Sequence, residues 1–275
     1  MRNTAKITTA VLATGALTLG LSACGSDKDA ASDTSGPLVV AASPVPHAEI
    51  LTYVKDHLAQ KAGLDLEVKE VTDYVTPNTS TEDGSVDANF FQTTPYLDDF
   101  NKKRGTHIVS VVDVHLEPLG LYSHKVDKAA DLKSGATVAV PNDTVNEGRA
   151  LQLLAANGLI KLKDGVGTTA TPADITENPK KLKFKELEAA TTPRSLDDVD
   201  AAVVNGNYAI EADLKPAKDA LVLESAKDNP NNNLFAVKEG NEDDPRVKKL
   251  AKLLTSPEVK KFIEDTYDGA VLPSF

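Results

Sequence analysis

The chain of 275 residues contains one cysteine and no tryptophan. A single thiol excludes an intramolecular disulfide and a metal site built from several cysteines. The motifs of zinc proteases, of hydrolases with a nucleophile elbow, of P-loops and of dinucleotide-binding loops are also missing. The five histidines lack the paired spacing that suggests a metal site. We therefore expect a protein that is not an enzyme and that needs no cofactor.

Positive charge is scarce as well. The chain has 41 acidic residues against 30 basic ones, which gives a formal net charge of −11. Proteins that bind nucleic acid present clustered lysine and arginine to the phosphates. An acidic chain with only five arginines is therefore not expected to have a nucleic-acid partner.

The first 23 residues have the order of a secretory signal peptide. Arg2 and Lys6 precede an uncharged apolar stretch from Ile7 to Leu21. That stretch is shorter than the ~20 residues of a membrane-spanning helix. Cys24 directly follows Leu-Ser-Ala, which resembles the lipobox of bacterial lipoproteins. The resemblance implies cleavage before Cys24 and a lipid on its thiol, which would anchor the protein to the extracytoplasmic face of the cell membrane. The alternatives are a secreted protein with a chance cysteine, or an uncleaved anchor.

Beyond the signal, the pattern is that of an α/β protein. Residues 24–36 form a polar tether with no large apolar side chain, and we expect it to be flexible. Alternating or compact apolar runs then predict strands, and apolar residues at helical spacing predict helices. The predicted strands are 38–42, 64–68, 106–114, 136–140, 182–187, 201–204 and 234–237, and the predicted helices start near 46 or span 95–103, 144–157, 244–254 and 257–267. The first strand–helix–strand unit predicts a parallel pair of strands.

Two extended stretches, 115–123 and 225–233, interrupt this alternation. If both are crossings, the chain forms two α/β lobes joined by two strands. Lobe I then holds residues 37–119 together with 229–275, and lobe II holds residues 120–228. A clamshell of this kind offers a cleft between the lobes as the natural ligand site.

Arg149 is a candidate for binding an anion. It follows a predicted strand and lies in the early turns of the predicted helix 144–157. The free N–H groups at a helix start favour an anion, and an arginine fork adds charge-assisted hydrogen bonds to a carboxylate. From spacing alone, the alternative is equally good: a surface arginine that pairs with Glu147 or another neighbour.

A second candidate is a cluster of aromatic residues. Phe90, Phe91 and Tyr96 lie within seven residues, and Tyr74 lies just upstream. On loops at strand ends such rings could wall an apolar pocket, and ordinary core packing is the alternative. Asn205 and Asn233, each at the boundary of an apolar strand, are either turn residues or polar ligands of an amino group.

Taken in order, many segments of this chain resemble the methionine-binding lipoproteins of bacterial ABC importers, the NlpA/MetQ family. The similarity runs over about residues 38–275. The matching segments are Ala-Ser-Pro-Val-Pro-His-Ala-Glu-Ile at 42–50, Asp-Tyr-Val-Thr-Pro-Asn at 73–78, Asp-Ala-Asn-Phe-Phe-Gln at 87–92, Pro-Tyr-Leu at 95–97, Val-Pro-Asn-Asp at 140–143, Asn-Glu-Gly-Arg-Ala at 146–150, Gly-Leu-Ile-Lys-Leu-Lys-Asp-Gly at 158–165 and Pro-Arg-Ser-Leu-Asp-Asp at 193–198. The resemblance implies the two-lobed periplasmic-binding-protein fold. It also implies an ABC permease with its ATPase subunit as partners.

The resemblance further implies a ligand site for methionine or a close analogue. The family's aromatic cage falls on Tyr74, Phe91 and Tyr96. The arginine that pairs with the ligand carboxylate falls on Arg149, with Asn146 beside it, and the asparagines that fix the amino-acid backbone fall on Asn205 and Asn233.

One position departs from the family pattern and bears on the ligand. Thr93 stands where many members have histidine, so that one side of the cage is altered. L-methionine, D-methionine, the sulfoxide and a short methionine-containing peptide all remain candidate ligands. A receptor for another amino acid, or a surface lipoprotein that binds a protein partner, are the alternative functions.

Overall fold

The computed structural model describes residues 36–275. The predicted signal peptide, Cys24 and all but the last residue of the predicted tether lie outside the described residues. Within residues 36–275, none of the helices combines the length and apolar character needed to cross a membrane.

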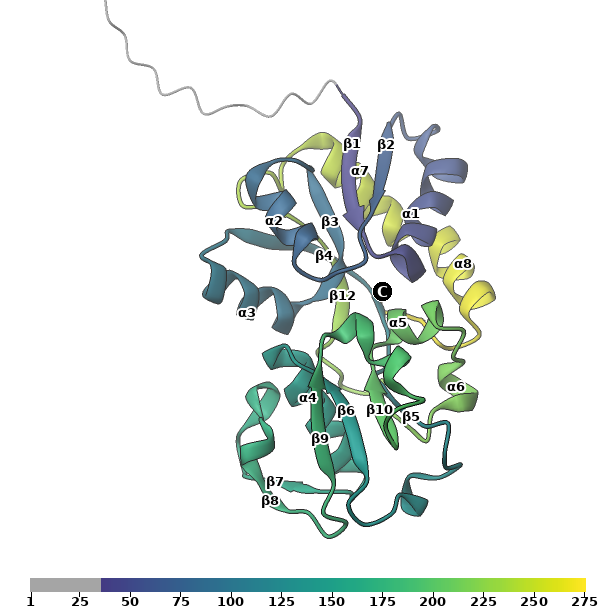
Figure 1. Ribbon diagram of the computed structural model, residues 1–275. Coiled ribbons are helices and arrows are strands. Elements are labelled where there is room, and N and C mark those ends of the chain that lie inside the picture. Colours follow the sequence, from purple (N-terminus) through teal and green to yellow (C-terminus); the bar gives the residue numbers. More distant parts are fainter. Residues whose placement is uncertain (1–35) are drawn as a thin grey trace, which may run out of the picture. The chain divides into compact units, whose positions relative to one another are not determined.

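The first sheet has six strands in the order β13-β4-β12-β3-β1-β2 (Figure 1). Their bounds are β1 (Leu38–Ala42), β2 (Leu66–Glu70), β3 (Ala88–Thr93), β4 (Ile108–Leu116), β12 (Asn232–Lys238) and β13 (Leu272–Pro273). β1 pairs in parallel with both β2 and β3, whereas β12 runs antiparallel between β3 and β4. The predicted parallel pairing of the first two strands is therefore confirmed.

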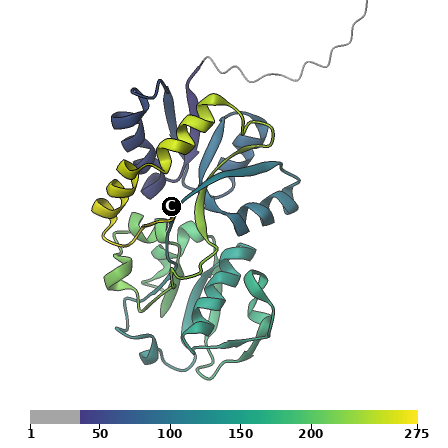
Figure 2. The ribbon, with the colours of Figure 1, turned by 180° about the vertical axis from the view of Figure 1, so that it is seen from behind.

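Helices cover this sheet on the faces that bury apolar side chains. They are α1 (Glu49–Val54), which a π-helical turn extends to Ala59, α2 (Thr76–Asp83), α3 (Thr94–Arg104), α7 (Pro245–Leu254) and α8 (Pro257–Tyr267). α2 lies in front of the sheet in Figure 1, and α7 and α8 lie in front when the molecule is seen from behind (Figure 2). Leu250 and Ile263, on α7 and α8, are fully buried in one core with Leu38, Val40 and Phe235 of the sheet.

The second sheet has five strands in the order β11-β5-β10-β6-β9. They are β5 (Gly120–Tyr122), β6 (Thr137–Pro141), β9 (Lys183–Leu187), β10 (Ala201–Val204) and β11 (Val222–Leu223), and the small pair β7 (Lys161–Leu162) and β8 (Ile175–Glu177) lies apart. The helices of this half are α4 (Thr144–Ala156), α5 (Gly206–Glu211) and α6 (Pro216–Asp219). Short 3₁₀ turns at 129–131, 167–169, 172–174, 189–191 and 193–195 complete it.

Two connections join the sheets. One is the segment 117–119 between β4 and β5, and the other is the segment 224–231 between β11 and β12. They lie side by side, because the N–H of Glu224 donates to the carbonyl of Leu119 at 2.8 Å. The protein is thus a two-lobed α/β structure with two crossing strands, whereas the predicted lobe boundaries stay a prediction.

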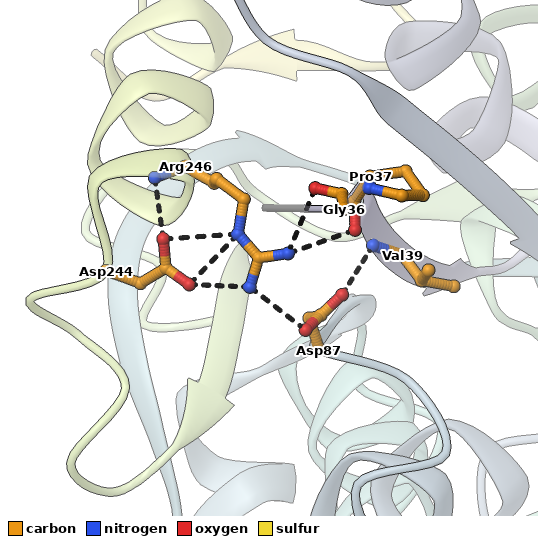
Figure 3. A network of polar contacts seen from close by, with 6 residues as sticks. All are labelled: Gly36, Pro37, Val39, Asp87, Asp244 and Arg246. Atoms are coloured by element: carbon orange, nitrogen blue, oxygen red, sulfur yellow. Dashed lines mark hydrogen bonds and ion pairs between the residues drawn. The ribbon is translucent and has the colours of Figure 1, made fainter. Parts of the chain in front are cut away.

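Arg246 ties the start of β1 to α7 (Figure 3). Its Nη1 donates to the carbonyls of Gly36 and Pro37, at 3.3 and 3.0 Å. Its Nη2 donates to Asp244 at 2.7 Å and to Asp87 at 3.3 Å. Asp244 also caps α7 by accepting the N–H of Arg246. The side chains of Arg246 and Asp244 are only 11% and 5% exposed, so this part of the network is largely shielded from water.

We expect Arg246→Ala to lower the free energy of unfolding by about 3 kcal/mol, because it leaves two carboxylates unpaired at a largely buried site. Urea denaturation measures the loss. The matched control is Arg194→Ala at an exposed position, where the expected change stays within about 0.5 kcal/mol. Equal losses in the two variants would contradict a stabilising role of the Arg246 network.

Candidate functional site

Between the lobes lies a small cavity, with about 30 Å³ of space for the centres of water-sized molecules. All eight residues predicted to bind the ligand line it. They are Tyr74, Phe91, Thr93, Tyr96, Asn146, Arg149, Asn205 and Asn233, and Gln92, Glu117, Gly206 and Asn207 join them. The last four were not predicted from the sequence.

Three rings form the aromatic wall. Phe91 lies on β3, Tyr96 on α3 and Tyr74 on the loop before α2. The ring centroids of Tyr74 are 5.8 Å from those of Phe91 and of Tyr96, and the Tyr96 hydroxyl donates to the carbonyl of Tyr74 at 2.9 Å. The prediction that Phe90 and Phe91 lie on a loop is wrong. They lie on a strand whose alternation turns Phe90 into the core and Phe91 to the cavity.

A buried amide network fixes this strand against α2. Asn78 of α2 donates to Gln92 at 2.8 Å, and Gln92 donates back to Asn78 at 2.7 Å. Asn89 donates to Asn78 and to Thr81, at 3.1 and 2.8 Å. Each side chain of this network makes at least one hydrogen bond, so the strand that carries Phe91 and Thr93 is held rigidly.

Arg149 lies in the second turn of α4 and is 6% exposed. Its Nε and Nη2 donate to the two carboxylate oxygens of Glu224, at 2.8 and 2.5 Å, and Nη2 also donates to the carbonyl of Glu117 at 2.9 Å. The alternative of a surface arginine that pairs with Glu147 is therefore wrong. Arg149 is bound to both crossings, and within residues 36–275 no hydrogen bond engages its Nη1.

The ion pair also sets the charge of its partner. Burial would raise the pKa of Glu224, but the hydrogen bonds and the charge of Arg149 hold that pKa below its ordinary value. The pair is therefore ionised at neutral pH.

Glu117 presents an acid to the cavity from the first crossing. Its Oε1 accepts from Nε2 of His115 at 2.7 Å and lies 3.3 Å from Nε2 of His47. Burial raises the pKa of Glu117, and the charge of Arg149 opposes that shift. Burial also lowers the pKa of His47 to about 4 and that of His115 to about 3. Both imidazoles are therefore neutral at pH 7, and His115 donates to the buried carboxylate of Glu117, whereas Nε2 of His47 is hydrogen-bonded to Asn233.

The same three side chains are a possible set of metal ligands, since their ligand atoms lie within 4.8 Å of one another. A metal would require both Nε2 atoms as lone-pair donors and hence both Nδ1 atoms as N–H donors. Metal-binding histidines almost always pass that second N–H to a carboxylate, carbonyl or water. Nδ1 of His115 has no partner among the described residues, so the cluster fits a hydrogen-bonded carboxylate better than a metal.

The asparagines come from elements of both lobes. Asn146 and Arg149 lie three residues apart on α4, Asn205 precedes α5 at its N-cap, and Asn233 lies within β12 rather than in a turn. Nδ2 of Asn205 donates to Oδ1 of Asn146 at 2.9 Å, and Nδ2 of Asn146 donates to Asp143 at 3.0 Å. Oδ1 of Asn233 lies 3.0 Å from Nε2 of His47. The cavity is thus lined by amides with fixed hydrogen-bond partners.

Comparison with known proteins places these features in a family. The profile of the NlpA lipoproteins matches residues 38–275. The methionine-binding lipoprotein MetQ of Bacillus subtilis is 43% identical over 92% of this chain and 93% of its own length. The D-methionine-binding lipoprotein MetQ of Salmonella typhimurium is 44% identical over 94% of this chain and 96% of its own.

A solved structure is similar as well. It is a nutrient-binding protein from Burkholderia cenocepacia bound to methionine, 49% identical to this chain, with a TM-score of 0.84 over 86% of this chain and 100% of that protein. A match of this extent in sequence and in fold, around a cavity with the predicted residues, leads to one conclusion: the chain belongs to the NlpA lipoprotein family.

Proposed function

We propose that this chain is the substrate-binding component of a bacterial ABC importer and that it captures methionine in the cavity between its lobes. The observation that carries the proposal is the chemistry of the lining. Among the described residues that line the cavity, Arg149 is the one cation and Glu117 the one acid, and three aromatic rings stand beside them. A free amino acid with an apolar side chain requires these three partners.

The cation and the acid of the cavity are complementary in charge to the two charged groups of a zwitterionic amino acid. The ligand carboxylate takes hydrogen bonds from Arg149 Nη1, and the ligand ammonium faces Glu117. Hydrogen bonds to charged groups contribute roughly 1.5–3 kcal/mol each. Because Glu224 already balances the charge of Arg149, a neutral zwitterion leaves the site without a large excess charge.

The rings of Tyr74, Phe91 and Tyr96 enclose the thioether. Full burial of a methionine side chain contributes roughly 1.5–3 kcal/mol, and sulfur–aromatic contacts add about 0.3–1.5 kcal/mol. Nanomolar binding requires about 12 kcal/mol. The polar contacts and the exclusion of water on closure must therefore supply most of the affinity.

Lipid on Cys24 would hold the receptor at the membrane, and closure at the two crossings would present both lobes to an ABC permease, whose ATPase subunit supplies the energy.

The alternative function is a lipoprotein that binds a protein partner. That function does not require buried polar atoms that line the cavity and lack a hydrogen-bond partner. Oδ1 of Asn205 and Nδ2 of Asn207 are such atoms, and they favour a small polar ligand.

The test is calorimetric titration of protein that has been unfolded and refolded to remove bound ligand. We expect one methionine per chain, with the methyl ester at least about tenfold weaker because it lacks the charge that Arg149 pairs with. D-methionine, the sulfoxide and glycyl-methionine, titrated in parallel, identify the preferred form. No heat with any of these compounds, or equal binding of the ester, would contradict the proposal.

A further inference from the structure

A one-way chain of hydrogen bonds runs from Asp143 to the cavity. The carboxylate of Asp143 caps α4 by accepting the backbone N–H of Asn146 at 3.0 Å. Both of its oxygens also accept from Nδ2 of Asn146, each at 3.0 Å. A carboxylate only accepts hydrogen bonds, so the NH₂ end of the Asn146 amide must face it.

The orientation of Asn146 determines the orientation of the next amide. With its NH₂ turned to Asp143, Asn146 offers Oδ1 to Asn205, whose Nδ2 donates to it at 2.9 Å. Oδ1 of Asn205 is then left over. It is buried without a partner, in a side chain that is 6% exposed and lines the cavity.

The acid of the cavity, Glu117, lies against the residue that follows Asn205, and both Asn205 and Glu117 line the cavity. Gly206, the next residue after Asn205, touches Glu117 so closely that a Cβ on it would lie 2.7 Å from Cβ of Glu117 and 3.1 Å from Oε2. An amide oxygen and a carboxylate together form a receptor for a group that donates several hydrogen bonds and carries positive charge. Reversing Asn205 would place an NH₂ group there instead and repel such a ligand.

We propose that Asp143 is a positioning residue that gives the cavity its preference for a protonated α-amino group: through Asn146 it holds the oxygen of Asn205, and not the nitrogen, toward the ligand. The inference rests on the proposed function and narrows its ligand class to free α-amino acids. Compounds that lack the ammonium group gain nothing from this chain of bonds.

The test measures how one substitution changes the affinity of the protein for two ligands. Asp143→Asn keeps a good helix cap, because asparagine caps as well as aspartate. The amide of the introduced asparagine can, however, turn its NH₂ group toward Asn146. The side-chain amide of Asn146 can then flip so that its oxygen accepts this hydrogen bond, and the amide of Asn205 can flip in turn. We expect methionine to bind at least about tenfold more weakly, the effect of losing or reversing a buried polar contact. 4-(Methylthio)butanoic acid, which has the same carboxylate and thioether but no ammonium, should change by less than about threefold.

The matched control is Asp200→Asn in the same lobe. Asp200 also accepts a backbone N–H, that of Thr137 at 2.8 Å, and it does not line the cavity. The control removes the same charge, so unchanged binding of both ligands shows that long-range electrostatics is not the cause. Thermal unfolding without ligand verifies that each variant is folded.

A second pair of variants tests the direction of the chain of bonds. Asp143→Asn combined with Asn205→Asp moves the carboxylate to the cavity end, where it accepts from the reversed Asn146 and still presents an oxygen to the ligand. This double variant should recover most of the lost methionine affinity. If Asp143→Asn does not fold, Asn205→Ala leaves the α4 cap intact and should show the same loss for methionine alone.

Each outcome decides the matter. Loss for methionine alone, with recovery in the double variant, supports the inference. Equal weakening of both ligands shows a purely structural role of Asp143, and unchanged binding shows that the chain of bonds does not reach the ligand, so that either result overturns it. Wild-type protein that fails to bind methionine overturns the proposed function itself, and the inference with it.

Discussion

Arg149→Ala is expected to weaken methionine binding at least tenfold and to lower the free energy of unfolding by about 3–5 kcal/mol. The loss of affinity follows from removing the one cation among the described residues that line the cavity. The loss of stability has a different origin. Glu224 is 16% exposed and would keep its charge without a cation to pair with, in a place where water reaches it poorly.

The two effects can be separated with a second variant. Arg149→Met combined with Glu224→Gln removes both charges and retains most of the volume, and replacing a buried pair in this way is often close to neutral for stability. We expect this double variant to unfold near the wild-type urea concentration and still to bind methionine at least about tenfold more weakly. Full affinity in the double variant would remove Arg149 from the ligand site.

Much of the fold is predictable because local pattern and tertiary packing agree. The strand at 201–204 and the helix at 257–267 have the predicted bounds, and β1 agrees as well. Ser256 caps the last helix and Pro257 opens it, while its apolar face enters the first core. In such segments every local signal indicates the same structure.

The strand β3 was missed for a physical reason. All six residues from Ala88 to Thr93 are buried, so the alternation of polar and apolar residues that identifies a half-exposed strand is missing. Asn89 and Gln92 are buried against α2 by amide hydrogen bonds that a sequence pattern does not reveal. The helix α2 itself has a polar sequence and begins where Asp73 accepts the N–H groups of Val75 and Thr76.

The candidate site was also predicted only in part. The eight residues that the family resemblance indicated all line the cavity, but the partners that hold them were not predicted. Glu224 and His47 contact Arg149 and Asn233 across 75 and 186 positions of the chain. Glu117 did give a signal, an acid next to proline within an otherwise apolar crossing. A charged residue in such a segment indicates a buried polar function.

The buried pair His47 and His115 predicts a strong loss of stability in acid. Burial lowers the pKa of His47 to about 4 and that of His115 to about 3, both below the value of about 6.5 in an unfolded chain. At pH values between the unfolded and the folded pKa, these histidines are protonated in the unfolded chain but stay neutral in the folded protein. The stabilisation is therefore complete above about pH 6.5 and is lost as the pH falls toward 4, by about 3 kcal/mol for each histidine.

Glu117 opposes part of this effect. Its raised pKa means that the folded protein takes up a proton there more readily than the unfolded chain, which favours the folded state as the pH falls. The net loss between pH 7 and pH 4 should therefore be smaller than the sum of the two histidine contributions, but still several kcal/mol.

Urea denaturation at a series of pH values measures this slope. His47→Gln combined with His115→Gln keeps two side chains that can donate to Asn233 and to Glu117 but cannot be protonated, so we expect the stability of this variant to vary much less with pH. His57→Gln, at an exposed position, is the matched control and should retain the steep dependence. A slope that is the same with and without the buried pair would show that other groups govern acid unfolding. A slope that disappears with it would mean that the buried histidines beside Glu117 limit the pH range in which the protein stays folded.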